Sequence, residues 1–150
     1  MQRLAPGDRD LARRLFAAVA AVFAEDDASL AAEPLGDRYL DRLLGREDFW
    51  AFAALAGDEV VGGLTAHTLP MTRAESAEVF IYDVAVRAEY RRRGVGRRLV
   101  EALRAAAGEA GIEVVFVPAD DEDAHALDFY RALGGAPAVV TIFTFEAGQP

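Results

Sequence analysis

The chain has 150 residues, of which 53% are hydrophobic and 27% are charged, and its formal net charge is −9. This length and balance fit one folded domain with a real core and exclude a disordered chain. The absence of cysteine excludes a disulfide framework, a cysteine-based zinc site and a thiol nucleophile. With only two histidines, no metal site is expected. An acidic chain is also not expected to bind nucleic acid, because that affinity rests on neutralising phosphates.

All the cationic residues are arginine, and six of them lie between Arg87 and Arg98 beside a single acid, Glu89. A basic island in an acidic chain indicates two ligands of opposite charge. A solvated basic surface remains the alternative.

The first predicted element is a helix that begins at Pro6 and Asp8 and runs to about Phe23. The apolar run 15–24 follows two arginines, as in a signal sequence. Its spacing is that of an amphipathic helix, however, and it is shorter than the ~20 residues that cross a bilayer. We therefore expect a cytoplasmic protein that does not associate with membranes.

The remaining elements follow from turn residues and apolar spacing. They are a helix over 37–44, a hairpin of strands over 49–55 and 60–69, a strand over 78–86, a helix over 96–110, a strand over 112–117, a helix over 123–133 and a last strand over 139–145. This order, α-α-β-β-β-α-β-α-β, predicts an α/β fold with a mixed central sheet flanked by helices. The last strand is apolar and is a candidate pairing edge, so we predict a homodimer.

A glycine-bearing turn lies between the strand over 78–86 and the helix that follows it. Its residues are Arg91, Arg92, Arg93, Gly94, Val95 and Gly96. Glycine permits positive φ and close backbone approach, and N–H groups at a helix N-terminus attract phosphate. The turn therefore predicts a diphosphate site with arginine side chains as outer clamps; an ordinary capped loop is the alternative.

The DVAV strand end, the RRRGVG turn and the Phe129-Tyr130 pair before Gly134 resemble the GNAT acetyltransferase superfamily, over nearly the whole chain from Leu4. The segments VVGGLTAHTLP, EVFIYDVAV, VPAD and FYRALG are further similar to type I aminoglycoside 3-N-acetyltransferases. The resemblance implies a single N-acetyltransferase domain over 1–150 that uses acetyl-CoA. Its implied substrate is an aminoglycoside, acetylated at the 3-amino group, and its implied effect is antibiotic resistance. Another cationic amine, such as a polyamine or a protein N-terminus, and a non-catalytic acyl-CoA-binding module remain open.

The resemblance also implies residue roles. The residues expected at coenzyme A are Val84, Ala85, Val86, Arg91, Arg92, Arg93, Gly94, Val95, Gly96, Arg97, Phe129 and Tyr130. The turn would bind the pyrophosphate, and the strand end would separate from the strand near 115–117 and hydrogen-bond the thioester arm. The N–H of Val84 would be the oxyanion donor, and Tyr130 would be a general acid near the thiol.

Asp83 is the predicted base, because a carboxylate within an apolar strand is costly unless it is paired or used. Strand alternation places Asp83 and Ala85 on one face, and Tyr82, Val84 and Val86 on the other. Since the usual pKa of an aspartate, about 3.9, is low for a base, neighbouring acids such as Glu78 are expected to raise it. Orienting the substrate ammonium is the open alternative role, and a purely structural aspartate is another.

Acidic side chains are expected to line the acceptor site and to attract a polycation. The predicted acceptor-contacting residues are Glu25, Asp26, Glu78, Asp83, Asp120, Asp121, Glu122 and Asp123. Capping of the helix that follows Asp120–Asp123 is an alternative role, and both roles can hold together. Because neither Ser29 nor Ser76 lies in a nucleophile motif, direct transfer in a ternary complex is expected.

Overall fold

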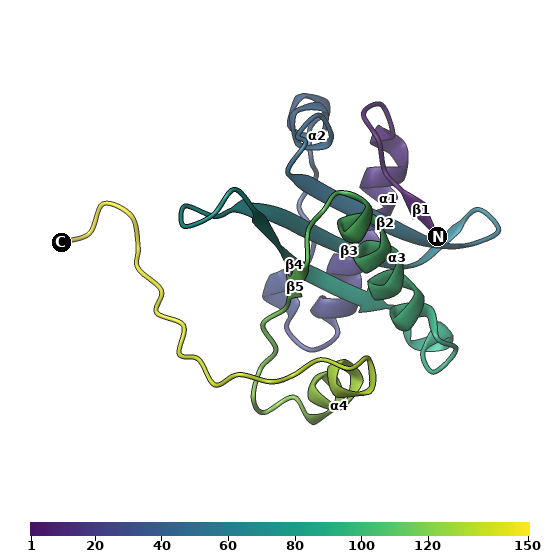
Figure 1. Cartoon of the computed structure of the whole chain (residues 1–150). Helices are drawn as coiled ribbons and strands as arrows, with labels where there is room; N and C mark the ends of the chain where they lie inside the picture. The colour runs from purple at the N-terminus through teal and green to yellow at the C-terminus, as the bar shows by residue number, and fades with distance from the viewer. The chain divides into compact units, whose positions relative to one another are not determined.

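The computed structural model describes residues 1–150 as two compact units, Met1–Pro118 and Ala119–Pro150 (Figure 1). The first unit contains a five-stranded sheet in the order β1-β2-β3-β4-β5. The strands are β1 (Gln2–Arg3), β2 (Phe49–Ala56), β3 (Glu59–Pro70), β4 (Ala77–Val86) and β5 (Val114–Phe116). Neighbouring strands from β1 to β4 are antiparallel, whereas β4 and β5 are parallel, so the sheet is mixed as predicted.

Three helices cover the two faces of this sheet. They are α1 (Arg9–Ala24), α2 (Asp37–Leu44) and α3 (Val95–Glu109), with short 3₁₀ helices η1 (Ala28–Leu30) and η2 (Ala88–Tyr90) between elements. A Cβ on Gly63 would meet Leu15 of α1, whereas a Cβ on Gly62 would meet Val95 of α3. Because successive strand residues point to opposite faces, α1 and α3 lie on opposite sides of the sheet.

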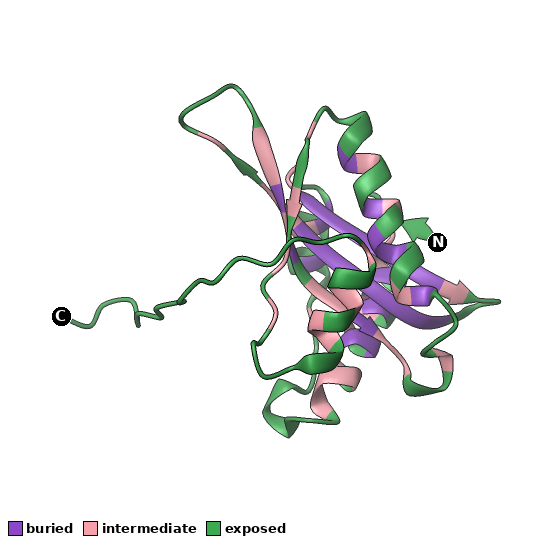
Figure 2. Ribbon diagram, turned by 60° about the horizontal axis from the view of Figure 1, so that its bottom comes forward, coloured by how far each residue is buried: buried purple, intermediate pink, exposed green.

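The core on the α1 side forms as the apolar spacing predicts. Leu11, Leu15 and Val19 of α1 pack with Leu40 of α2 and Phe49 of β2. Figure 2 shows the middle of the sheet buried and the outer helix surfaces exposed. Across the surface, Arg9 pairs with Asp37 at 3.0 Å and with Asp41 at 2.7 Å, which joins the start of α1 to α2.

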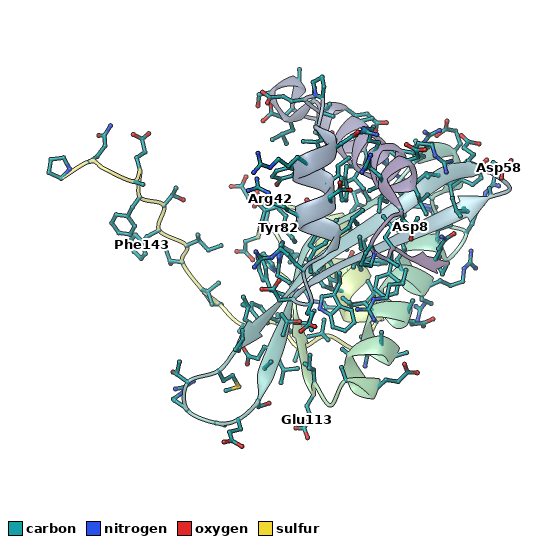
Figure 3. All side chains as sticks on the ribbon, turned by 90° about the horizontal axis from the view of Figure 1, so that it is seen from above. Asp8, Arg42, Asp58, Tyr82, Glu113 and Phe143 are labelled. Atoms are coloured by element: carbon teal, nitrogen blue, oxygen red, sulfur yellow. The ribbon has the colours of Figure 1, made fainter.

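The hairpin of β2 and β3 turns at the predicted residues. Gly57 has φ +60°, a left-handed conformation that glycine adopts without strain. Asp58 lies at the hairpin end labelled in Figure 3. The short strand β1, which pairs with Ala53 and Phe52 of β2, was not predicted, because two residues carry no periodicity.

The second unit contains one helix, α4 (Ala124–Ala132), and no strand. The prediction of a strand over 139–145 is therefore wrong for this structure. The segment is apolar, but a strand needs a hydrogen-bonding partner, and no other strand lies in this unit. Its large apolar side chains are all exposed, and Figure 3 labels Phe143 on this extended segment.

The predicted fold class is confirmed: a mixed sheet flanked by helices, with the other helices and strands close to their predicted positions. No helix combines the length and the apolar character that crossing a bilayer requires.

Candidate functional site

The turn before α3 has the backbone shape of an anion site. Gly94 has φ +74° and is the N-cap of α3, with no side chain capping the helix. Arg92 also has a positive φ, +60°, which is uncommon for a residue with a side chain. The N–H groups of Arg92, Arg93 and Gly94 meet no acceptor within the chain. Together with the N–H groups of the first helical turn, they fit a diphosphate.

The arginines of this turn divide between structural contacts and exposed positions. Arg91 donates from Nε to the carbonyl oxygen of Val86 at 3.0 Å and pairs with Glu25 at 3.4 Å. Arg93 lies over the ring of Tyr90, 5.4 Å from its centroid. Arg97 pairs with Glu101 along the helix at 3.7 Å. The side chain of Arg92 makes no such contact. It and the unpaired backbone N–H groups of the turn are therefore free to donate hydrogen bonds to a ligand.

Strand β4 continues beyond its pairing with β5. Strand β5 pairs only with Glu78, Val79 and Phe80, although β4 continues to Val86. Val115 and Phe116 pair with Val79 and Phe80, and β5 ends before it reaches Val84, Ala85 and Val86, so the separation of these residues from a neighbouring strand stays a prediction. Backbone groups on that side of the strand end have no strand partner, as binding of an extended arm requires.

A β-bulge interrupts β4 at Tyr82. The register passes from Ile81 opposite Ala66 directly to Asp83 opposite Thr65, which leaves Tyr82 without a partner on β3. Tyr82 contacts the ring of His67, and Asp83 contacts Thr65, two residues away from His67 on β3. The expectation that Tyr82 and Asp83 point to opposite faces is therefore wrong, because the extra residue of a bulge breaks strict alternation.

Asp83 is half-buried and lies next to this bulge. Burial raises the pKa of its carboxyl group, while a 2.8 Å hydrogen bond from Thr65 and the nearby His67 act in the opposite direction. Glu78 is not a cause of the rise: it lies five residues away along an extended strand, about 16 Å. Desolvation, rather than a neighbouring acid, therefore moves Asp83 toward the range of a general base.

The predicted acids of the first unit have different roles. Glu25 is the C-cap residue of α1 and pairs with Arg91, so it links α1 to the turn before α3. Asp26 is exposed and makes no ion pair. Asp27, its neighbour, accepts hydrogen bonds from the N–H and hydroxyl groups of Ser29.

In the second unit, two of the four consecutive acids shape the start of α4. Asp123 accepts a 3.0 Å hydrogen bond from the N–H of Ala126, and Asp120 accepts one of 2.9 Å from the N–H of Glu122. Asp121 and Glu122 are exposed, and their side chains have no partner. The capping role is therefore present for Asp123, while the side chains of Asp121 and Glu122 make no hydrogen bond or ion pair within the chain.

Tyr130 lies in α4 beside Phe129, with ring centroids 5.0 Å apart. Partial burial, and then the negative charge of Asp123, raise the pKa of its hydroxyl group. A phenol with a raised pKa keeps its proton at neutral pH, as a proton donor requires.

Thr65 was not among the predicted site residues. Its sequence context, within an apolar strand, carries no signal of a role. Only the register of β3 against β4 brings its hydroxyl group to Asp83.

Comparison with known proteins adds the family. The model of the Acetyltransferase (GNAT) family matches residues 11–134. An aminoglycoside acetyltransferase, HMB0005, from an uncultured soil metagenomic sample is 34% identical with a TM-score of 0.90, over 98% of this chain and 97% of that one. A second, meta-AAC0020, also from an uncultured soil metagenomic sample and solved with sisomicin, is 32% identical with a TM-score of 0.86, over 97% and 93% of the two chains.

More distant structures share the fold alone. AAC(6')-Iy, solved with a bisubstrate analogue, is 18% identical with a TM-score of 0.71, over 97% of this chain and 95% of that one. No curated protein matches the chain. The family model spans most of the sequence, and two solved aminoglycoside acetyltransferases are more than 30% identical over nearly their whole length. The chain belongs to the GNAT acetyltransferase family.

Proposed function

We propose that the protein is an acetyl-CoA-dependent N-acetyltransferase that acetylates the 3-amino group of an aminoglycoside antibiotic and so confers resistance. The observation that carries the proposal is the half-buried carboxylate of Asp83, which is hydrogen-bonded to Thr65, makes no ion pair and lies on the strand that leads to the glycine-bearing turn. A half-buried carboxylate without an ion pair would be stabilised by a cationic substrate. The likeness to two aminoglycoside acetyltransferases supports the same acceptor class.

The cofactor would be held by the main chain. The N–H groups of Arg92 to Arg97 would receive the pyrophosphate, with the exposed Arg92 side chain beside them. The open edge of Val84 to Val86 would hydrogen-bond the extended arm. When bound, acetyl-CoA supplies the activated acetyl group that the amine attacks.

Three residues would handle charge and protons at the acceptor amine and the carbonyl. Asp83 would accept a proton from the substrate ammonium, which makes the amine nucleophilic. The N–H of Val84 would donate to the oxygen on which negative charge develops. Tyr130 would hold a proton for the departing sulfur. Transfer would be direct in a ternary complex, because the chain has no cysteine and the hydroxyl group of Ser29 is bonded to Asp27.

The choice of the 3-amino group as the acetylated position rests on the resemblance of the strand and loop segments quoted above. Both units would act together as one N-acetyltransferase domain, since the family model covers parts of each. A cytoplasmic location belongs to the same proposal, because coenzyme A thioesters are intracellular metabolites.

The proposal includes a homodimer. Its support is the apolar segment 139–145, whose Val139, Ile142, Phe143 and Phe145 are all more than 70% exposed. Exposed apolar surface of this kind marks association sites. Sedimentation equilibrium tests it: the wild-type protein is expected to be dimeric, and Phe143→Asp monomeric. A monomeric wild-type protein would remove this part of the proposal.

The deciding experiment is an acetylation assay with gentamicin, sisomicin, spermidine and an amino-terminal peptide, with the product located by NMR. We expect turnover of the aminoglycosides and acetylation at the 3-amino group. Absence of aminoglycoside turnover would reject the acceptor, and turnover of spermidine or peptide alone would assign a different cationic amine. Calorimetric binding of acetyl-CoA without transfer to any amine would assign a non-catalytic binding module.

Asp83→Asn provides the matched variant. It keeps the shape of the side chain and an oxygen for the Thr65 hydrogen bond, but it cannot take a proton. We expect kcat to fall by roughly 10²–10⁴-fold while binding of acetyl-CoA is unchanged. Unchanged kcat would remove the base role from Asp83.

A further inference from the structure

Tyr82 exposes an aromatic ring beside the half-buried Asp83. Its exposed fraction is 66%, high for a tyrosine in the middle of a sheet strand. The bulge of β4 causes this position, because Tyr82 has no partner on β3 while Ile81 and Asp83 both do. Bulges commonly re-aim a side chain at a functional site. Tyr82 is labelled in Figure 3.

The orientation of the Tyr82 ring is fixed by its neighbours. His67 contacts it edge-on at 5.8 Å between centroids, with an interplanar angle of 82°, and Phe80 does so at 6.1 Å and 75°. His67 in turn packs on Phe49 at 5.4 Å, and Phe80 on Phe116 at 5.3 Å. The ring therefore belongs to an array that crosses four strands, and it is held in place although it is exposed.

The ring face of Tyr82 carries no cation. Elsewhere in the chain, Arg3 lies 4.1 Å above the ring of Trp50, and Arg93 lies over Tyr90. No arginine occupies the corresponding position on Tyr82, and Asp83 beside it makes no ion pair. Thr65 donates to Oδ2 of Asp83, whereas Oδ1 accepts no hydrogen bond from the chain.

We propose that Tyr82 and Asp83 form an ammonium-binding corner, in which Oδ1 of Asp83 accepts an N–H of a cationic amine and the ring of Tyr82 contacts the same cation. The face of an aromatic ring and a carboxylate both attract positive charge, and a desolvated carboxylate is stabilised by it. The corner therefore selects a cationic amine over a neutral acceptor. The identification of this cation as the amine that is acetylated rests on the proposed function; binding of a cation at the corner does not.

Kinetics of two Tyr82 variants separate the ring from its hydroxyl group. In Tyr82→Leu we expect the KM for the aminoglycoside to rise about 5- to 30-fold, as loss of a cation–ring contact implies. The KM for acetyl-CoA should not change, and Tyr82→Phe should behave like the wild type. Tyr39→Leu is the matched control, since Tyr39 is 51% exposed on α2 and should leave both KM values unchanged. An unchanged aminoglycoside KM in Tyr82→Leu, or an equal rise in Tyr82→Phe, would overturn the role of the ring.

A binding measurement tests the corner without any turnover. Tetramethylammonium is a suitable probe, because it is attracted by aromatic rings but has no N–H to donate. In protein with ¹³C-labelled tyrosine, titration against NaCl of equal ionic strength should give saturable NMR shifts at Tyr82 and none at Tyr39. In Tyr82→Leu no tyrosine signal should shift, and in Asp83→Asn the shift of the Tyr82 signal should weaken.

The two experiments fail in different ways. Saturable shifts at Tyr82 in a protein that acetylates no aminoglycoside would leave the corner standing and remove the proposed function. Aminoglycoside turnover without a response of Tyr82 to the probe, and without a change of KM in Tyr82→Leu, would remove the corner alone.

Discussion

Thr65 donates a 2.8 Å hydrogen bond from Oγ1 to Oδ2 of Asp83, across the β3–β4 pair at the bulge. This bond stabilises the ionised carboxylate and lowers its pKa, against the effect of burial. The two residues therefore set together the pH range in which Asp83 can accept a proton.

Thr65→Val should raise the pKa of Asp83 further, because it removes the hydrogen bond and leaves the burial in place. The acid limb of the kcat/KM profile should then move to higher pH, and activity near the limb should fall while the plateau at higher pH is less affected. Thr65→Ser keeps the hydroxyl group and should restore the wild-type profile. A pH series of initial rates measures this; an acid limb at the same pH in Thr65→Val would show that Asp83 does not control it.

Asp83 should also make stability depend on pH. Because burial raises its pKa in the folded chain above the unfolded value, about 3.9, the folded state binds the proton more tightly. This contribution to stability is complete below the unfolded pKa and is lost as the pH rises through the folded pKa. The melting temperature of Asp83→Asn relative to the wild type should therefore increase over that window and then level off. If the difference in melting temperature between Asp83→Asn and the wild type does not change with pH, the pKa of Asp83 is not raised in the folded chain.

Gly94 is the position in the turn before α3 where a positive φ favours glycine. At φ +74° a side chain is strained, so Gly94→Ala should cost roughly 1–2 kcal/mol of stability. Relief of that strain by a change of φ would redirect the N–H groups, so the KM for acetyl-CoA should rise while the KM for the acceptor stays constant. Gly108→Ala is the control: it lies in the same helix with open space around it and should gain up to about 1 kcal/mol. Equal effects of both substitutions in thermal unfolding and kinetics would argue against a special role for the turn.

The sequence predicts what local patterns determine. The apolar stripe of α1 and the Gly57-Asp58 turn were predictable because helix periodicity and turn chemistry act within a few residues. The bulge at Tyr82 and the Thr65 contact were not, since both depend on the register between two strands. The strand predicted over 139–145 shows the same limit: β-forming residues do not make a strand until a partner is present.

Mutations should distinguish the two acids that hydrogen-bond the start of α4, Asp120 and Asp123, from the two exposed acids, Asp121 and Glu122. Asp123→Ala removes the N-cap bond to Ala126 and should cost about 0.5–2 kcal/mol, seen as faster amide hydrogen exchange at Ala126. Asp121→Asn combined with Glu122→Gln removes two exposed charges without touching a bond. It should leave exchange unchanged but raise the KM for aminoglycosides, more at low ionic strength than at high. A KM that does not respond to the double substitution would restrict this segment to its capping role.

Gly63 of β3 lies against α1 with no room for a side chain. A Cβ at this position would overlap Cδ1 of Leu15, which is fully buried, and would lie close to Cγ2 of Val19. Gly63→Ala should therefore destabilise the protein by about 1–3 kcal/mol, as overpacking of a core does. In a Leu15→Ala background the same substitution should cost much less, because the Leu15 atoms it would overlap are gone. A double-mutant cycle by urea unfolding measures this coupling directly. If the free-energy costs of Gly63→Ala and Leu15→Ala are additive, α1 must move away from the sheet to admit the methyl group. The contact of Leu15 with Gly63 would then not determine the position of α1.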